Sequence, residues 1–342
     1  MDIDEARDLF PGSSGYLNTA ALGLPPRPAM DALRSALDRW ENGLATPADY
    51  DEAIAGSRQL FADLVHVPAD RVAVGAQVSA LVGLVASSLS AGSSVLCVDD
   101  EFTSVTYPFV ARSDLGLRVQ CVPVESLADA IGPATDLVAV SAVQSKDGRL
   151  VDLAAVREAA AHHGARVLVD ATQALGWLPI DAREYDAVVV GAYKWLLSPR
   201  GTAFIAVRPD LLERIQPLYA GWYAGDSPWD SIYGLPARLA ADARRLDLSP
   251  AWLSWVGTEP ALRLITEVGV RAIHQHNVAL ANALRDRLGL EPGDSAIVAL
   301  DVPEGLPLDG LSTSMRAGRL RVSFHLYNTM DDVDRLVEAI GR

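Results

Sequence analysis

Short apolar runs alternate along the first two thirds of the chain with longer segments whose apolar residues recur every three or four positions. The short runs are typical of strands buried on both faces of a sheet, and the longer segments are typical of amphipathic helices. We expect strands at 72–74, 95–99, 117–122, 137–141, 167–170, 188–190 and 202–207. We expect helices at 28–40, 50–65, 80–89 and 153–163. Strands and helices that alternate at this spacing predict an α/β fold, with a mostly parallel sheet and helices on both of its faces.

The pattern changes at about residue 218. Several aromatic residues crowd a loop that is punctuated by glycine and proline, namely Tyr219, Trp222, Tyr223, Trp229 and Tyr233. Helical spacing then returns at 251–254 and 260–288, strand-like runs follow at 297–302 and 319–323, and an amphipathic helix is expected at 331–340. We therefore expect a large domain over residues 15–258 and a smaller α+β domain over residues 1–14 and 259–342. The aromatic loop favours a segment that faces the active site or a second subunit, and it hints at a bulky or apolar substrate.

Composition narrows the class of protein. Half of the 342 residues are hydrophobic, which indicates a globular chain with a large core. A formal net charge of −15 argues against nucleic acids and anionic membranes as partners. Three of the first five residues are acidic, unlike a signal peptide, and no apolar run is long enough to span a bilayer, so we expect a cytoplasmic protein. Cys97 and Cys121 lie in strand-like apolar runs, which predicts buried thiols without disulfide or metal ligation.

Two of the expected strands deliver a charged residue at their carboxyl ends, where open α/β sheets place their ligand sites. Asp170 ends one strand, and Lys194 follows the next; the chain has only one other lysine, Lys146. Taken singly, these residues could be a strand-end acid and a surface lysine. A desolvated lysine at that edge would be less basic and able to form an imine, and a nearby carboxylate could keep a pyridinium nitrogen protonated. The pair predicts that Lys194 carries pyridoxal phosphate (PLP) and that Asp170 pairs with its ring nitrogen.

Two further segments supply groups that PLP requires. An apolar strand passes through a turn of small residues into an apolar helix, and such a turn presents backbone N–H groups to an anion. We assign the cofactor phosphate to Ala76, Gln77 and Val78, with Ser79 as a further hydroxyl donor, although an ordinary strand-to-helix turn has the same pattern. Phe102 follows the strand at 95–99 and could stack on the cofactor ring, where the alternative is a residue of the core.

Three motifs resemble the class V aminotransferase family. They are Asp170-Ala-Thr-Gln173, the segment from Tyr193-Lys194-Trp195 to Ser198-Pro199-Arg200-Gly201, and the segment from Leu320-Arg321 to Tyr327-Asn328-Thr329. The family consists of fold-type I PLP enzymes, among them cysteine desulfurases, isopenicillin N epimerase-like proteins, kynureninases and hercynylcysteine sulfoxide lyases. The resemblance covers nearly the whole chain and implies a fold-type I architecture, in which the large domain binds PLP.

The resemblance also implies a role for individual residues. Lys194 matches the lysine that forms the imine, Asp170 the partner of the pyridine nitrogen, and Gln173 the residue that hydrogen-bonds the ring hydroxyl. Arg321 matches the arginine that binds the α-carboxylate of an amino-acid substrate, and a guanidinium fork suits that task. The resemblance further implies a substrate contact at Asn18, and a homodimer in which the aromatic loop at 219–233 reaches across to the partner.

The chain departs from the family pattern at three places. Phe102 stands where the desulfurases usually have a stacking histidine. Gly191 and Tyr193 occupy positions where the family often has a serine and a histidine that hold the phosphate; Tyr193 could still donate its hydroxyl, whereas Gly191 cannot. The loop that carries the nucleophilic cysteine in desulfurases is reduced here to residues 315–319, and no cysteine lies near it. Persulfide transfer is therefore not expected.

Three hypotheses for function follow. The first is an enzyme acting at Cα of an amino acid, with transaminase-type activity ranked ahead of a C–S (β-elimination) lyase and an isopenicillin N epimerase-like epimerase. The second is a non-catalytic scaffold on the same fold, which the joint presence of Lys194, Asp170 and Gln173 disfavours. The third is a residual desulfurase that uses Cys97 or Cys121, which is disfavoured because both cysteines are expected in buried strands.

Overall fold

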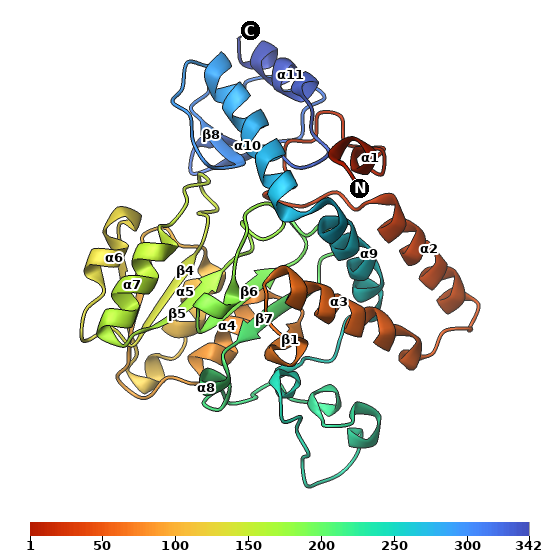
Figure 1. Cartoon of the computed structure of the whole chain (residues 1–342), viewed down its shortest axis with the longest axis vertical. Coiled ribbons are helices and arrows are strands. Elements are labelled where there is room, and N and C mark those ends of the chain that lie inside the picture. Colours follow the sequence, from red (N-terminus) through yellow and green to blue (C-terminus); the bar gives the residue numbers. More distant parts are fainter. Residues whose placement is uncertain (342) are drawn as a thin grey trace.

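A seven-stranded sheet forms the centre of the computed structural model, which describes residues 1–341 (Figure 1). Its strands are β1 (Val72–Gly75), β2 (Ser94–Val98), β3 (Arg118–Val122), β4 (Leu137–Ser141), β5 (Arg166–Asp170), β6 (Ala187–Gly191) and β7 (Ala203–Val207). They lie in the order β1-β7-β6-β5-β4-β2-β3, and only β7 runs antiparallel to its neighbours. The predicted mostly parallel sheet is confirmed, and all seven expected strands are present.

The structure contains the expected helices and, in addition, some that were not expected. They are α1 (Ile3–Arg7), α2 (Arg27–Glu41), α3 (Asp51–Leu64), α4 (Val78–Ala86), α5 (Thr103–Val110), α6 (Leu127–Ala130), α7 (Leu153–His163), α8 (Pro209–Leu212), α9 (Trp252–Val268), α10 (Val270–Arg287) and α11 (Met330–Ile340). Of these, α1, α5, α6 and α8 were not expected. The helix expected at 80–89 begins two residues earlier, at Val78, which brings its first turn closer to the end of β1. The long helical segment after residue 260 is divided at Gly269, whose φ of +88° is accessible mainly to glycine.

Alternate residues of each central strand enter two separate buried clusters. Val188 and Val190 of β6 join the cluster that includes residues of α3, α7 and α9. Ala187 and Val189 of the same strand join the cluster that includes residues of α4, α5 and α8. Because successive side chains of a strand point to opposite faces, this division shows that both faces of the sheet are covered by helices.

A second sheet lies at one end of the molecule, next to α10, α11 and both chain termini (Figure 1). Its strands β8 (Ile297–Leu300), β9 (Ser314–Arg316) and β10 (Arg319–Ser323) are antiparallel, in the order β8-β10-β9. Strand β9 was not expected; it pairs with β10 through a tight turn in which Ala317 and Gly318 have positive φ angles, as two-residue hairpins require. The smaller α+β unit is thus present, while the boundary at residue 258 stays a prediction and falls inside α9.

The two cysteines differ in burial. Cys97 on β2 is fully buried, as expected, but Cys121 on β3 is exposed. The expectation for Cys121 was wrong because β3, one of the two edge strands, is poorly covered: none of its side chains is buried, whereas all residues of the other edge strand, β1, are buried. Over residues 1–341 the structure contains neither a helix suited to crossing a membrane nor a cluster of metal-ligating side chains.

Candidate active site

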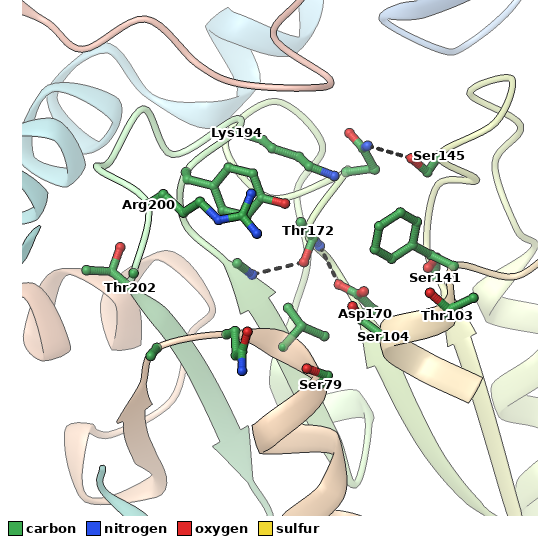
Figure 2. A pocket seen from close by; sticks show the side chains of 18 residues that line it. Ser79, Thr103, Ser104, Ser141, Ser145, Asp170, Thr172, Lys194, Arg200 and Thr202 are labelled. Atoms are coloured by element: carbon green, nitrogen blue, oxygen red, sulfur yellow. Dashed lines mark hydrogen bonds between the residues drawn. The ribbon is translucent and has the colours of Figure 1, made fainter. Parts of the chain in front are cut away.

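A cavity of about 540 Å³ opens at the carboxyl ends of β4, β5 and β6 (Figure 2). Every residue that the sequence assigned to the cofactor lines it, namely Ala76, Gln77, Val78, Phe102, Asp170, Gln173, Tyr193 and Lys194. Ser79, Thr103, Ser104, Ser141, Ser145, Thr172, Gly191, Arg200, Gly201 and Thr202 complete the lining. The structure therefore brings together groups from four separate loops that the sequence could only associate by pattern.

Asp170 is the last residue of β5, and its side chain is buried at the inner end of the cavity. The backbone N–H of Thr172 donates a 2.8 Å hydrogen bond to Asp170 Oδ1. Burial raises the pKa of the Asp170 carboxyl, and the Thr172 hydrogen bond partly opposes this effect. Because no cationic side chain among residues 1–341 pairs directly with this carboxylate, it is available to a cationic or N–H group of a ligand.

Lys194 lies three residues after β6 and is only 5% exposed. Its Nζ atom lies 5.3 Å from the centroid of the Phe102 ring and 5.6 Å from that of the Tyr193 ring, and within the described chain it has no hydrogen-bond acceptor. Burial lowers the pKa of this amine, whereas the charge of Asp170 acts in the opposite direction. The burial and the lowered pKa agree with the expectation from the sequence; a buried amine of this kind can act as a nucleophile or base, and that role of Lys194 stays a prediction.

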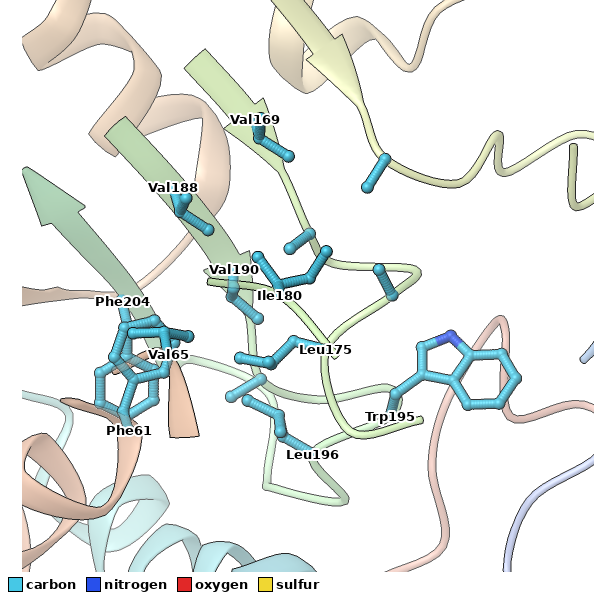
Figure 3. Close-up of a cluster of buried hydrophobic side chains, with 14 of the residues drawn as sticks. Phe61, Val65, Val169, Leu175, Ile180, Val188, Val190, Trp195, Leu196 and Phe204 are labelled. Atoms are coloured by element: carbon cyan, nitrogen blue, oxygen red, sulfur yellow. The ribbon is translucent and has the colours of Figure 1, made fainter. Parts of the chain in front are cut away.

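Hydrogen bonds fix the orientation of the Gln173 amide. Trp195 Nε1 donates a 2.8 Å hydrogen bond to Gln173 Oε1, and Gln173 Nε2 donates to Ala20 O at 2.9 Å and to Ser145 Oγ at 3.0 Å. Trp195 itself is fully buried in the apolar cluster that also contains Val188 and Val190 (Figure 3). The amide oxygen and both N–H groups of Gln173 are therefore engaged within the chain, and only the bond to Ser145 Oγ is made to a residue that lines the cavity.

The first turn of α4 lies at the opposite side of the cavity from these groups (Figure 2). Gln77 is the N-cap residue, with extended backbone, and no side chain caps the N–H groups that follow it. Uncapped N–H groups and the helix dipole attract an anion. The turn at 76–78 can therefore hold the phosphate that the sequence assigned to it.

Sequence reasoning missed Glu101, which orders the loop that carries Phe102. Its buried carboxylate accepts hydrogen bonds from the backbone N–H of Ser141 and of Phe102, both at 2.8 Å, and from Ser141 Oγ at 2.6 Å. Phe102 itself is 45% exposed, at the rim of the cavity. In the sequence, Glu101 is visible only as an acidic residue between a strand and an aromatic residue. The neighbouring residues do not indicate that its carboxylate is buried.

Arg321 comes from β10 of the small sheet and is 1% exposed. Its Nη1 donates to the backbone carbonyl and to the hydroxyl of Ser145, which lines the cavity, while Nε and Nη2 are buried without a partner among the described residues. Burial and the neighbouring charge of Arg316 lower the pKa of Arg321 to about 10. A buried guanidinium with unused N–H groups is suited to a carboxylate ligand.

Asn18 lies beside the same strand, where its backbone bridges to Ser323, two residues after Arg321. Its Oδ1 atom is likewise buried without a partner in the described part of the chain. Neither Asn18 nor Arg321 lines the cavity itself. Their roles in substrate binding stay predictions that the nearby unpaired polar atoms support.

The aromatic loop does not reach the cavity within one chain. Trp222 packs against Tyr223 and Trp229, and Trp229 Nε1 donates a 2.7 Å hydrogen bond to Asp51 Oδ2 on α3. None of the five aromatic residues lines the cavity, so the suggested bulky or apolar substrate gains no support from this structure. Tyr233, at 91% exposure, keeps the loop a candidate for contact with a second subunit.

Comparison with known proteins gives concordant matches. The family model described as "Aminotransferase class-V" matches residues 16–301. An uncharacterized aminotransferase, YcbU, of Bacillus subtilis (strain 168) is 28% identical over 99% of this chain and 97% of its own length. Isopenicillin N epimerase of Streptomyces clavuligerus is 27% identical over 99% of this chain and 98% of its own.

Solved structures share the fold. The cystine C–S lyase C-DES, in complex with its reaction product cysteine persulfide, has a TM-score of 0.85 at 22% identity and covers 97% of this chain and 98% of its own. A mutant of C-DES with glycine covalently linked to its PLP cofactor has a TM-score of 0.88, also at 22% identity, and covers 98% of each chain.

Proposed function

This chain belongs to the aminotransferase class-V family, and from that premise we propose that it is a PLP-dependent enzyme acting at Cα of an amino-acid substrate. Its fold is the fold-type I architecture expected from the sequence. One observation carries the proposal: the Lys194 amine is buried without a hydrogen-bond acceptor in the same cavity as the Asp170 carboxylate.

The groups around the cavity fit PLP. Asp170 offers a carboxylate for the ring nitrogen, and the Gln173 N–H that donates to Ser145 Oγ could donate to the ring hydroxyl instead. Phe102 offers an aromatic face, the turn at 76–78 offers uncapped N–H groups for the phosphate, and Tyr193 offers a hydroxyl. A volume of about 540 Å³ lies within the range typical of cofactor sites. Lys194 would hold the aldehyde carbon covalently.

The proposed mechanism assigns one task to each residue. PLP, when bound, supplies an electron-poor ring that accepts the electron pair released at Cα. Arg321 would hold the substrate carboxylate through its unused Nε and Nη2 groups, which orients the Cα–H bond. Once the substrate amino group has replaced it at the aldehyde carbon, Lys194 Nζ would be free to remove the Cα proton, since burial favours its neutral form. Asp170 would keep the proton on the ring nitrogen.

The fate of that proton decides the reaction. If Lys194 delivered the proton to the cofactor, the reaction would be a transamination; if the proton reached the opposite face of Cα, it would be an epimerisation; and expulsion of a β-substituent would make the protein a lyase. We propose a transaminase-type activity, which the similarity to YcbU supports. The alternatives are a C–S (β-elimination) lyase, supported by the likeness to C-DES, and an epimerase, supported by the similarity to isopenicillin N epimerase.

Persulfide transfer and a non-catalytic role are less well supported. Neither Cys97 nor Cys121 lines the cavity, and burial raises the pKa of both thiols. A scaffold without catalytic function would leave the conjunction of Lys194, Asp170 and Gln173 in one cavity unexplained. We also propose a homodimer, which size-exclusion chromatography with light scattering can test.

The decisive experiment exploits the presence of only two lysines. The protein is loaded with PLP, reduced with borohydride and digested, and the modified peptide is identified by mass spectrometry. We expect the label on Lys194, its loss in Lys194→Ala, and full labelling in the control Lys146→Ala, whose side chain forms an ion pair with Asp100. Absence of PLP uptake by the wild-type protein would contradict the proposal and favour the scaffold.

A second measurement identifies the reaction. Amino acids with and without β-leaving groups are screened for spectral change of the bound cofactor, and the products are then analysed. An oxo acid indicates transamination, pyruvate with a released thiol indicates a C–S lyase, and inversion at Cα indicates an epimerase.

A further inference from the structure

The cavity is lined by one acidic and two cationic side chains, those of Asp170, Lys194 and Arg200. Three groups of PLP need a partner of a particular kind: the ring nitrogen needs an acid, the aldehyde needs an amine, and the phosphate needs a cation. The proposed function assigns Asp170 to the ring nitrogen and Lys194 to the aldehyde. Arg200 is then the one charged side chain of the lining that has no assigned task, and the phosphate is the one charged group of the cofactor without a full counter-charge.

The sheet register places the Arg200 loop next to the phosphate turn. Gly75 of β1 pairs with Ala203 of β7, and Ala203 also pairs with Gly191 of β6, so these three residues form one row across three strands. Residues 76–78 leave the sheet from one member of that row, and residues 200–202 approach it at the next. The Arg200 side chain and the first turn of α4 therefore lie at the same edge of the sheet and line the same cavity (Figure 2).

The Arg200 loop is held by a hydrogen bond to its backbone, and the guanidinium packs against a ring without an acidic side chain to neutralise its charge. The Ser254 hydroxyl donates a 3.0 Å hydrogen bond to the Arg200 carbonyl, and Arg200 Cζ lies 5.2 Å from the centroid of the Tyr193 ring. Within residues 1–341 its side chain forms neither an ion pair nor a hydrogen bond. A guanidinium stacked on a ring face keeps its N–H edge free for an anion.

The other groups at this edge of the sheet cannot neutralise the negative charge of a phosphate. The start of a helix contributes about half an elementary charge, whereas a bound phosphate carries close to two. Gly191 has no side chain, and an added Cβ would lie 3.3 Å from Tyr193 Cε1 and 3.4 Å from Val78 Cγ2, so a hydroxyl-bearing residue there would crowd its neighbours. The Tyr193 hydroxyl is neutral. A full cation is needed.

We propose that Arg200 is the cationic ligand of the cofactor phosphate, acting together with the N–H groups at the start of α4. This inference rests on the proposed function, because it presupposes that the cavity binds PLP. Arg200 lies in one of the motifs that resemble the family, but no role was predicted for it from the sequence. The inference gives the stacked Arg200–Tyr193 pair a role in holding the cofactor.

The test compares PLP with pyridoxal, which has the same ring and aldehyde but no phosphate. Dissociation constants of both are measured by absorbance titration of the apoprotein, for the wild type, Arg200→Gln, Arg200→Lys and the control Arg271→Gln. Arg271 is an exposed residue on α10 without a charged partner in the described chain, so both glutamine variants change the net charge equally. We expect Arg200→Gln to weaken PLP about tenfold and pyridoxal less than about twofold. Arg200→Lys should retain most of the preference for PLP over pyridoxal, and Arg271→Gln should retain all of it.

Phosphorus NMR of the bound cofactor gives a readout that a merely structural role would not move. Arg200 should favour the phosphate dianion, so the phosphate should titrate at higher pH in Arg200→Gln than in the wild type. An unchanged preference for PLP over pyridoxal in Arg200→Gln, with PLP still attached to Lys194, would overturn the inference and leave the proposed function standing. Failure of the wild-type protein to take up PLP would overturn both.

Discussion

Trp195 Nε1 donates a 2.8 Å hydrogen bond to Gln173 Oε1, which fixes the orientation of the Gln173 side-chain amide. A rotation of that amide by 180° would place two N–H donors against each other, at the cost of a hydrogen bond between buried groups. The residue adjacent to Lys194 thus fixes which end of the Gln173 amide donates at the cavity, where its N–H bonds Ser145 Oγ.

We predict that Trp195→Phe weakens PLP binding roughly fivefold, because one neutral hydrogen bond no longer holds the amide. Trp177→Phe is the matched control: Trp177 is equally buried, but its Nε1 donates to the Gln173 backbone carbonyl, at 2.7 Å. Both variants should lose about 2 kcal/mol in free energy of unfolding. Absorbance titration with PLP and urea denaturation provide the two measurements. Equal PLP affinity in the two variants would refute the role of the Trp195 contact.

Arg321→Met should raise the dissociation constant of an amino-acid substrate or product at least about tenfold while leaving PLP affinity unchanged. The reason is that the unused Nε and Nη2 groups of Arg321 would bind the α-carboxylate. Arg319→Met serves as the control, since Arg319 lies two residues earlier on β10 and pairs with Asp301. Spectral titration of the PLP-loaded protein measures both constants. If amino acids bind equally well to both variants, the carboxylate site lies elsewhere.

His325 makes stability depend on pH. Burial lowers the pKa of its imidazole to about 4, compared with 6.5 for an unperturbed histidine, and its Nε2 lies 3.0 Å from the Trp195 carbonyl. The unfolded chain therefore binds a proton at a pH where the native state does not. The contribution of His325 is fully present above pH 6.5 and is lost as the pH falls toward 4.

Between pH 7 and pH 5, the wild-type protein should lose about 2 kcal/mol of stability through this residue. His325→Gln should lack that component, whatever its stability at pH 7. Urea denaturation of both proteins at the two pH values gives the difference. An identical pH dependence of the two proteins would show that His325 is not the group responsible.

The cysteines should be dispensable for catalysis. Cys97→Ala and Cys121→Ser, separately and together, are expected to leave the turnover rate of the PLP-loaded enzyme within about twofold, because neither thiol lines the cavity. A thiol reagent should modify Cys121 in the native protein and Cys97 only after unfolding. Loss of cysteine-dependent sulfide or alanine formation in either variant would revive the desulfurase hypothesis.

Local pattern was sufficient for much of the fold and for the centre of the site. Valine-rich runs separated by amphipathic segments favour a mostly parallel sheet covered by helices, because strands buried on both faces are apolar along their whole length. The carboxyl ends of those strands meet at one edge, so Asp170 and Lys194 were bound to approach each other once the sheet formed. These features depend on residues close together in the sequence.

Other features depend on which distant segments pair, and only the tertiary structure decided them. Cys121 is exposed because β3 became the edge strand, and strand order is not encoded in the strand itself. Arg321 contacts Ser145 across 176 residues, and Arg200 lines the same cavity as residues 76–78 because β7 lies between β1 and β6. Burial and charge pairing are properties of the assembled surroundings of a residue, so the sequence alone determined the types of group in the site, and packing determined which of them remain unpaired for a ligand.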